Sequence, residues 1–255
     1  MIFYFSATGN SKYAALKIAA TTEEEPVAIS DCLKSRKFIF EISDQERIGF
    51  VTPTYFLGLP SVVIEFLEKL ELRMPGQYHP YIYHVATFGT TTGQVGKTVE
   101  EFLNKKRLSL CGRFSVQMPD TWTPVFNLTD KEKIKRINDE AEKQIAEAAE
   151  KIKQELVGDF SRRKLPMAAV KLYYPLYERQ RETKHFTVDD CCIGCGLCAK
   201  KCPAGAIEMQ GDRPVWVREK CALCLGCLHR CPQVAIQYGK KTKKHGQYLN
   251  PNMTI

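Results

Sequence analysis

Cysteine is the residue type whose spacing most clearly predicts chemistry in this 255-residue sequence, which contains 11 cysteines. Nine of them lie in the segment 191–231. Two runs there, 192–203 and 221–232, share the spacing C-x2-C-x2-C-x3-C followed by proline. The second run repeats the first 29 residues later, together with an Ala-Ile pair at 206–207 and 235–236. The pattern predicts a duplicated unit with two metal centres.

Iron–sulfur clusters suit this spacing better than zinc, which stays as the alternative. Structural zinc sites prefer two separated C-x2-C pairs, whereas each run places a third cysteine at the same short interval and a fourth before proline. We expect a reducing, cytoplasmic location because the sequence shows no signal-peptide pattern, and clustered cysteines then favour metal ligation over disulfides. Cys32, Cys111 and Cys191 fall outside the repeat, and we expect them to be ordinary packing or neighbouring thiols.

The segment 183–240 resembles the bacterial two-cluster ferredoxins. The resemblance implies one-electron transfer at low potential through two 4Fe-4S clusters. In that family the fourth cysteine of each run binds the other cluster. The resemblance therefore implies a first ligand set of Cys192, Cys195, Cys198 and Cys231, and a second ligand set of Cys202, Cys221, Cys224 and Cys227.

A second candidate site follows the first apolar run, Ile2–Phe5. Residues 6–11, which we call the phosphate loop, read Ser-Ala-Thr-Gly-Asn-Ser and lead into a helical pattern. Hydroxyl and amide side chains around one glycine at a helix N-terminus predict backbone N–H groups that converge on an anion. The Gly-Lys-Ser/Thr end of a Walker loop and a G-x-G-x-x-G turn are both absent from this loop. The alternative is a plain helix cap.

Alternating strand and helix patterns must position this loop. We expect strands at Ile2–Phe5, Phe38–Ile42, Ile48–Thr52, Tyr81–Phe88 and Arg113–Met118, and helices at 12–20, 62–70, 94–107 and 130–156. Such alternation predicts an α/β domain with a doubly wound, five-stranded parallel sheet covered on both faces. Ligands of such sheets bind beyond the carboxyl ends of the strands. The loops 53–60 and 87–93, rich in threonine, glycine and aromatic residues, leave the same edge and suit a flat polar ring.

Residues 1–157 resemble the flavodoxins, which bind FMN. The resemblance implies phosphate contacts from Ser6, Thr8, Gly9, Asn10 and Ser11, and contacts to the flavin ring from Thr54, Tyr55, Phe56, Gly58, Thr87, Phe88, Gly89 and Thr90. Plain core packing is the alternative for Tyr55 and Phe88, and Trp122 could cover the flavin or a domain contact. Both ring-flanking loops lack Asp and Glu, and Lys97 is close in sequence. We therefore expect two-electron reduction of FMN to be comparatively easy.

The whole chain resembles the flavodoxin/ferredoxin fusion proteins, found mainly in anaerobic organisms. We expect an FMN domain at 1–157, an ordered connector at 158–182, and a small α+β two-cluster ferredoxin domain with a basic tail at 183–255. The resemblance implies electron transfer between a low-potential ferredoxin-type partner and an acceptor reached through FMN. Two alternatives stay open: a flavin-dependent reductase of a quinone, nitro compound or nicotinamide, and a non-catalytic redox sensor with an empty flavodoxin fold.

The net charge of +8 is concentrated in the cysteine-rich segment. Residues 191–255 carry 10 Lys and Arg against 3 Asp and Glu. Bound clusters and FMN would lower this excess, so we expect a surface that steers an acidic redox partner and no nucleic-acid partner. No apolar run is long enough for a membrane span. The five histidines are scattered and form no acid–base constellation.

Overall fold

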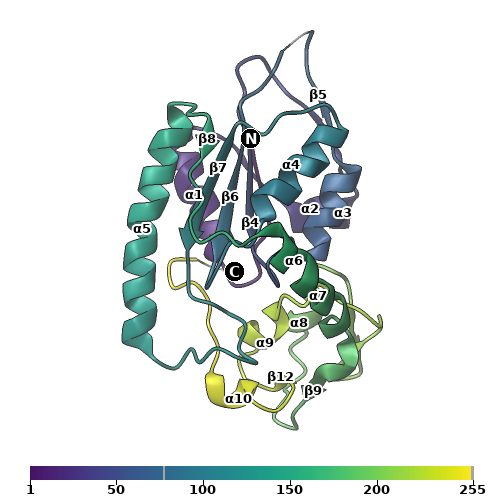
Figure 1. The fold of residues 1–255 in the computed structure, drawn as a ribbon. Coiled ribbons are helices and arrows are strands. Elements are labelled where there is room, and N and C mark those ends of the chain that lie inside the picture. The colour runs from purple at the N-terminus through teal and green to yellow at the C-terminus, as the bar shows by residue number, and fades with distance from the viewer. Residues whose placement is uncertain (77, 254–255) are drawn as a thin grey trace.

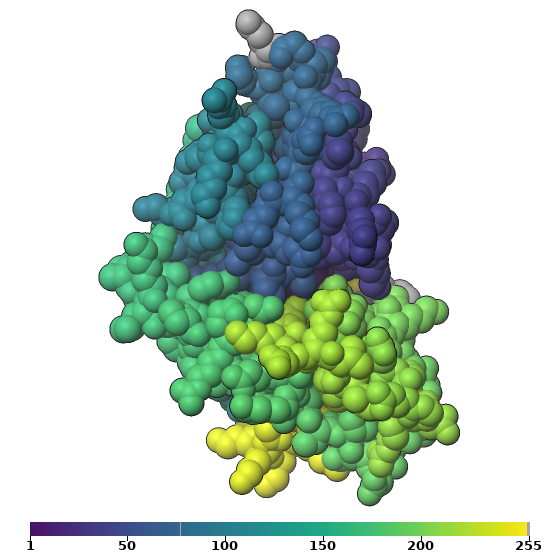
Figure 2. All heavy atoms as spheres, turned by 90° about the vertical axis from the view of Figure 1, so that its right-hand side faces the viewer, coloured from purple at the N-terminus to yellow at the C-terminus, as the bar shows by residue number. Residues whose placement is uncertain are grey.

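The computed structural model describes residues 1–76 and 78–253. An α/β part lies above a smaller cysteine-rich part, and the chain after the last helix turns back toward the sheet (Figure 1). Seen from the side, the cysteine-rich part abuts the lower end of the α/β part along a broad boundary (Figure 2). None of the described helices is long and apolar enough to span a membrane.

The main sheet is parallel throughout, and its order is β2-β1-β4-β6-β7-β8. Its strands are β1 (Ile2–Tyr4), β2 (Pro26–Ala28), β4 (Ile48–Pro53), β6 (Ile82–Phe88), β7 (Gly112–Gln117) and β8 (Gly158–Asp159). The central strands β4 and β6 are almost wholly buried, as expected for a sheet covered on both faces. The predicted doubly wound α/β fold is confirmed.

Two details of the predicted sheet are wrong. The strand expected at 38–42 is β3 (Ile39–Glu41), which pairs with β5 (Glu71–Arg73) outside the main sheet. The edge strand is instead β2, three residues that begin with proline and are too short to show an alternating pattern. The sheet also has a sixth strand, β8, whose two residues follow position 157. A strand of two residues carries no periodic signal either.

Five helices cover the sheet. One face is covered by α1 (Asn10–Thr22) and α5 (Lys131–Lys153), and the other by α2 (Ile29–Ser35), α3 (Ser61–Lys69) and α4 (Val95–Lys105). Asp130 caps α5, because its carboxylate accepts a hydrogen bond of 2.9 Å from Lys133 N–H. The Ala and Ile stripe of α5 packs against β7 and α1, so α5 is the covering helix that its periodicity predicts.

The cysteine-rich part contains short elements. They are η1 (Thr183–His185), β9 (Phe186–Val188), α8 (Leu197–Lys200), β10 (Ile207–Gln210), β11 (Arg213–Trp216), α9 (Gly226–Arg230), β12 (Ile236–Tyr238) and α10 (Thr242–His245). The antiparallel pairs β9–β12 and β10–β11 flank the two cysteine runs. Each run contains a one-turn helix and is followed by a strand, so the two runs repeat in structure as they do in sequence. This is the small α+β architecture expected of the C-terminal part.

The connector is helical and packs against both parts. Its helices are α6 (Met167–Tyr173) and α7 (Pro175–Gln180). The side chain of Tyr177 is fully buried. Its hydroxyl accepts a hydrogen bond of 3.1 Å from Ser61 N–H in α3 and donates one of 2.8 Å to the carbonyl of Ala222. One side chain thus joins the α/β part to the second cysteine run.

Candidate functional site

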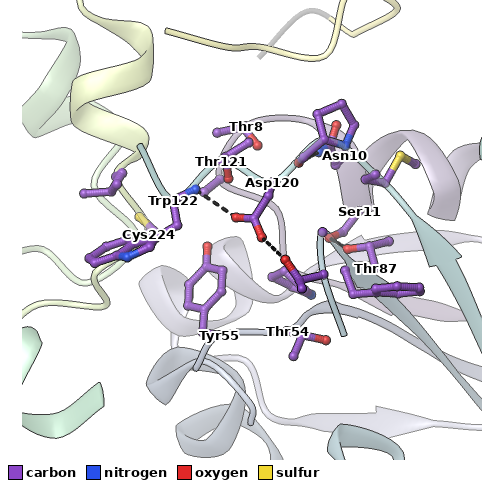
Figure 3. A pocket seen from close by; sticks show the side chains of 18 of the residues that line it. Thr8, Asn10, Ser11, Thr54, Tyr55, Thr87, Asp120, Thr121, Trp122 and Cys224 are labelled. Atoms are coloured by element: carbon purple, nitrogen blue, oxygen red, sulfur yellow. Dashed lines mark hydrogen bonds between the residues drawn. The ribbon is translucent and has the colours of Figure 1, made fainter. Parts of the chain in front are cut away.

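A cavity of about 350 Å³ opens at the carboxyl ends of the central strands. Five segments line it, namely the phosphate loop, residues 53–57, 87–91 and 118–122, and residues 223–225 of the second cysteine run, together with Phe126 and Tyr173. Figure 3 shows Asn10 and Ser11 on one side of this cavity and Trp122 and Cys224 on the other. The predicted edge of the sheet therefore carries the site.

Most residues predicted to bind FMN line this cavity. They are Ser6, Thr8, Asn10, Ser11, Thr54, Tyr55, Phe56, Thr87, Phe88, Gly89 and Thr90. Ser11 and Thr87 share a hydrogen bond of 2.7 Å between their hydroxyls, which joins the phosphate loop to the end of β6. The N-terminus of α1 begins in the cavity wall, and the first N–H groups of a helix have no acceptor within the helix itself.

The two other predicted glycines act beside the cavity and do not line it. Gly9 has φ of 98°, a left-handed conformation that side chains disfavour, and its N–H donates to Ser6 Oγ over 3.1 Å. Gly58 closes a tight turn with Tyr55, because each accepts the other's N–H at 2.8 Å. A Cβ on Gly58 would lie 2.2 Å from the ring of Tyr174. The structure thus assigns Gly58 a packing role against the connector and no cavity contact.

The side chain of Asn10 is occupied by the protein itself. Its Nδ2 donates to the carbonyl of Pro119 over 3.3 Å, and its Oδ1 accepts from Tyr248 at 2.8 Å and from Asn250 at 3.1 Å. A phosphate in the cavity would therefore meet the backbone N–H of Asn10 in the first turn of α1. Neither Tyr248 nor Asn250 carries a motif that predicts this contact.

The cavity fits a ligand with one anionic end and one flat polar end. Thr54 Oγ1 is buried in the wall and has no hydrogen-bond partner among the described residues, so it can bond a ligand. Phe56 and Leu57 both have positive φ, 47° and 70°, and this strained turn presents their side chains at the cavity. Phe56 packs edge-on against Trp122, with ring centroids 5.1 Å apart. These features suit a phosphate at α1 and a flavin ring between the loops.

Sequence reasoning missed the carboxyl in the cavity. Asp120 accepts hydrogen bonds from Trp122 N–H at 3.1 Å and from the Thr90 hydroxyl at 3.2 Å (dashed in Figure 3), and burial raises its pKa. The two ring-flanking loops do lack acidic residues, but a third loop supplies one, and Lys97 lines a different cavity. A signal was available, since Asp120 lies two residues after the end of the predicted strand 113–118.

The first ligand set surrounds a small apolar space. Cys192, Cys195, Cys198 and Cys231 line it together, with Met209 and Pro214. Cys231 comes from the second run, so the structure brings together the crossed set that the ferredoxin resemblance implies. Cys195 is exposed, and the neighbouring Ile193 is 62% exposed. This set lies close to the molecular surface.

The second ligand set is more deeply placed. Burial is the main cause that raises the pKa of Cys221 to about 12 and of Cys224 to about 11, and the proximity of Cys202 adds to both shifts. Backbone N–H groups point at sulfurs of both ligand sets: Leu223 donates to Cys221 over 3.2 Å. Ala206 donates to Cys202 over 3.3 Å, and Ala235 donates to Cys231 over the same distance, which explains why the alanines recur with the cysteines. Such N–H groups stabilise thiolates that bind iron.

No three His, Cys, Asp or Glu side chains of the described chain converge on a single metal-ion position. The thiolates of a 4Fe-4S cluster bind different irons and therefore surround a volume. Both ligand sets have the all-cysteine donor chemistry that such clusters need.

Comparison with known families defines the class of protein. A family model described as "Flavodoxin domain" matches residues 1–147, and one described as "4Fe-4S dicluster domain" matches residues 191–236. The first match covers more than half of the chain, so the chain belongs to the flavodoxin domain family. It carries a 4Fe-4S dicluster domain at its C-terminal side, and the predicted flavodoxin/ferredoxin fusion is confirmed.

Individual relatives match parts of the chain. One subunit of the ion-translocating oxidoreductase complex of Methanosarcina acetivorans is 48% identical over 46 residues, which are 18% of this chain and 17% of that protein. A "Ferredoxin-like protein in nif region" of Trichormus variabilis is 37% identical over 49 residues, 19% of this chain and 42% of that protein. The chain thus spans less than half the length of these curated relatives.

Two solved structures share low similarity with this chain. The Trp repressor binding protein from Bacillus subtilis has 14% identity and a TM-score of 0.35, covering 59% of this chain and 96% of that one. Rubredoxin oxygen:oxidoreductase from Desulfovibrio gigas has 16% identity and a TM-score of 0.33, covering 58% of this chain and 36% of that one.

Proposed function

We propose that this protein transfers electrons between two 4Fe-4S clusters and FMN. The observation that carries the proposal is the shared wall: residues 223–225, which include the predicted cluster ligand Cys224, line the same cavity as the phosphate loop. A cluster held by the second ligand set would lie directly behind that wall. FMN takes up one or two electrons whereas each cluster passes one, so the pair would connect one-electron and two-electron chemistry.

The proposed roles divide by region. Residues 1–157 hold FMN, with the phosphate loop and the N-terminus of α1 at its phosphate and residues 54–56 and 87–90 beside its ring. Residues 183–255 hold the clusters through the two ligand sets, and residues 158–182 join the two parts. Asp120, Thr54 and the aromatic residues of the wall orient the ring and exclude water from it.

We place the entry of electrons at the first ligand set. It lies near the surface, beside exposed Ile193. It also belongs to the segment 191–255, which contains 10 Lys and Arg but only 3 Asp and Glu. An acidic, low-potential ferredoxin-type protein fits such a surface by charge. The acceptor would be reached at the flavin. Low-potential clusters close to the surface suit the cytoplasm of an anaerobic cell.

Anaerobic reconstitution followed by rapid mixing tests the proposal. We expect eight iron and eight sulfide atoms and one FMN per chain, since two 4Fe-4S clusters require these counts. After mixing with a reduced ferredoxin, the cluster absorbance should change first and the flavin absorbance second. FMN that stays oxidised while both clusters are reduced would contradict the proposed electron path.

The same preparation separates the two alternative functions. A dedicated reductase would turn over a quinone, nitro compound or nicotinamide at a rate that matches flavin oxidation. A redox sensor with an empty flavodoxin fold would contain iron and sulfide but would not bind FMN.

The preparation also tests the zinc alternative for the cysteine runs. Four zinc-binding thiolates in each set would give zinc in place of iron, without the brown colour.

A further inference from the structure

The chain after α10 forms a strap, with Tyr248 and Asn250 buried, between helix α9 and the phosphate loop. We call residues 247–250 the C-terminal strap. The side-chain amide of Gln247 donates to the carbonyl of Leu228 at 2.6 Å and to that of Cys231 at 2.9 Å. Tyr248 N–H donates to His229 Nδ1 over 3.1 Å. The strap is therefore tied to the helix that leads into a predicted cluster ligand.

The other side of the strap holds the phosphate loop. The Tyr248 hydroxyl donates to Asn10 Oδ1 over 2.8 Å, and Asn250 Nδ2 donates to the same oxygen over 3.1 Å. Asn250 N–H donates to the carbonyl of Thr8 over 2.8 Å. Tyr248 and Asn250 are 5% and 2% exposed. The described lining of the cavity does not include them, so they hold the loop from its outer side.

Helix α9 also contacts the cavity loops directly. The guanidinium of Arg230 donates to the carbonyl of Ala7. Because His229 Nδ1 accepts from the strap, its Nε2 carries the proton and donates to the carbonyl of Thr121 over 2.9 Å. Two neighbouring residues of α9 thus hold two different walls of the cavity.

These contacts determine where the N–H groups of the loop point. In a trans peptide the C=O and the following N–H lie on opposite sides of the chain. Arg230 and Asn250 hold the carbonyls of Ala7 and Thr8 outward, so the N–H groups of Thr8 and Gly9 face inward. In agreement, Gly9 N–H donates to Ser6 Oγ across the loop. An anion-binding loop works through such converging N–H groups.

We propose that the C-terminal strap and α9 are positioning elements of the flavin phosphate site. The inference rests on the proposed binding of FMN and deepens it. The cluster-bearing part preorganises the phosphate loop, so the affinity for the phosphate of FMN depends on residues far away in sequence. By linkage, phosphate binding stabilises the docked strap to the same extent.

The test compares FMN with riboflavin, which has the same ring and no phosphate. Both ligands are titrated into the anaerobically reconstituted full chain after flavin removal, with flavin fluorescence as the readout. Tyr248→Phe deletes the hydroxyl bound to Asn10 and keeps the ring. We expect its Kd for FMN to rise about fivefold to tenfold, because a buried hydrogen bond that orders the loop is lost. The Kd for riboflavin should stay unchanged.

Two further variants complete the design. Asn250→Ala removes the second donor to Asn10 and should weaken FMN binding in the same ligand-selective way, so the proposal remains testable if Tyr248→Phe fails to fold. Tyr238→Phe is the matched control. Its hydroxyl donates to the carbonyl of Gln180 over 2.7 Å, away from the phosphate loop, and its loss should leave both Kd values unchanged.

Each outcome is decisive. Selective weakening of FMN supports the strap as a positioning element. Equal weakening of FMN and riboflavin, or no weakening of either, overturns that inference while the proposed function stands. A wild-type protein that carries its clusters but binds neither flavin would overturn the proposed function itself, and the inference with it.

Discussion

The two cysteine runs share one backbone conformation, but different residue types adopt it at equivalent positions. Gly194 and Gly196 in the first run, and Gly205 just after it, have φ of 66°, 70° and 54°. The positions 29 residues later, Leu223, Leu225 and Val234, have φ of 49°, 51° and 53°. The turn between the cysteines therefore requires left-handed residues, and the second run accepts backbone strain that the first run avoids with glycine.

The leucines have a reason to be there. Leu223 and Leu225 are 3% and 2% exposed, and they line the cavity at the carboxyl ends of the central strands. Burying each side chain contributes about 1.5–3 kcal/mol, which offsets about 1–2 kcal/mol of strain in the left-handed conformation. The glycines of the first run lie near the surface, where a leucine would gain little. The second repeat unit thus carries apolar residues that pack against the α/β part of the same chain, whereas the first repeat unit carries glycines and lies near the solvent.

The largest expected effect is on flavin reduction, compared between a variant that lacks one ligand of the second set and a variant that lacks one ligand of the first set. In Cys224→Ser the second cluster should be lost, and flavin reduction by reduced ferredoxin should stop, because a cluster held by that set would lie behind the cavity wall. In Cys195→Ser the first cluster should be lost, while a small chemical reductant can still reduce the second cluster and the flavin. Iron counts and stopped-flow absorbance measure both. Flavin reduction by reduced ferredoxin at the wild-type rate in Cys224→Ser would break the comparison.

Exchange of the turn residues should give the next largest effect. Leu225→Gly relieves strain but removes a buried side chain, so we expect the free energy of unfolding to fall by about 2–4 kcal/mol. Gly196→Leu should cost about 1–2 kcal/mol, from strain alone. A Cβ at that position meets Met209 at 3.8 Å, an ordinary contact. Anaerobic urea unfolding followed by circular dichroism measures both, and the opposite ranking would contradict the proposed offset.

Charge reversal beside the first run tests where the partner docks. Lys200 and Lys201 are exposed at the end of α8. The double variant Lys200→Glu/Lys201→Glu should lower the second-order rate with an acidic ferredoxin about tenfold at low salt, and the difference should shrink as salt rises. Lys135→Glu, at an exposed side chain of α5, is the control and should have little effect on this rate. A salt-independent rate in the wild-type protein would exclude electrostatic steering.

The smallest expected effect concerns Asp120, the carboxyl in the lining of the cavity. Burial raises the pKa of Asp120 in the folded protein. Its contribution to stability is therefore complete below the unfolded aspartate pKa of about 3.9 and is lost as the pH rises through the raised pKa. Asp120→Asn should slightly stabilise the flavin-free protein at pH 7 and flatten this part of the pH profile. Unfolding midpoints between pH 3 and 8 measure it, and an unchanged profile would contradict the assignment.

Local pattern in the sequence was enough to predict the cavity edge and the cysteine repeat. The phosphate loop and the alternating strands are continuous segments whose spacing reflects their own backbone geometry. The sequence could not predict that β2, and not β3, forms the edge of the main sheet. A three-residue edge strand carries less signal than the apolar run at 38–42. The contact of Asn10 with Tyr248 joins residues 238 positions apart, and nothing in either local pattern encodes it. The packing role of Gly58 could not be predicted either, because its requirement comes from Tyr174, a residue of the connector.

The hydroxyl of Tyr177, bonded to Ser61 on one side and to Ala222 on the other, has a consequence for modularity. A chain cut at the connector would separate the Tyr177 hydroxyl from either Ser61 N–H or the Ala222 carbonyl, depending on the side of Tyr177 on which the cut falls, and would expose Leu223 and Leu225 to water. Although the two halves match separate families, neither half is an independent structural module. Transplanting the cluster-bearing half onto another flavodoxin would require transplanting the surface of α3 and the phosphate loop along with it.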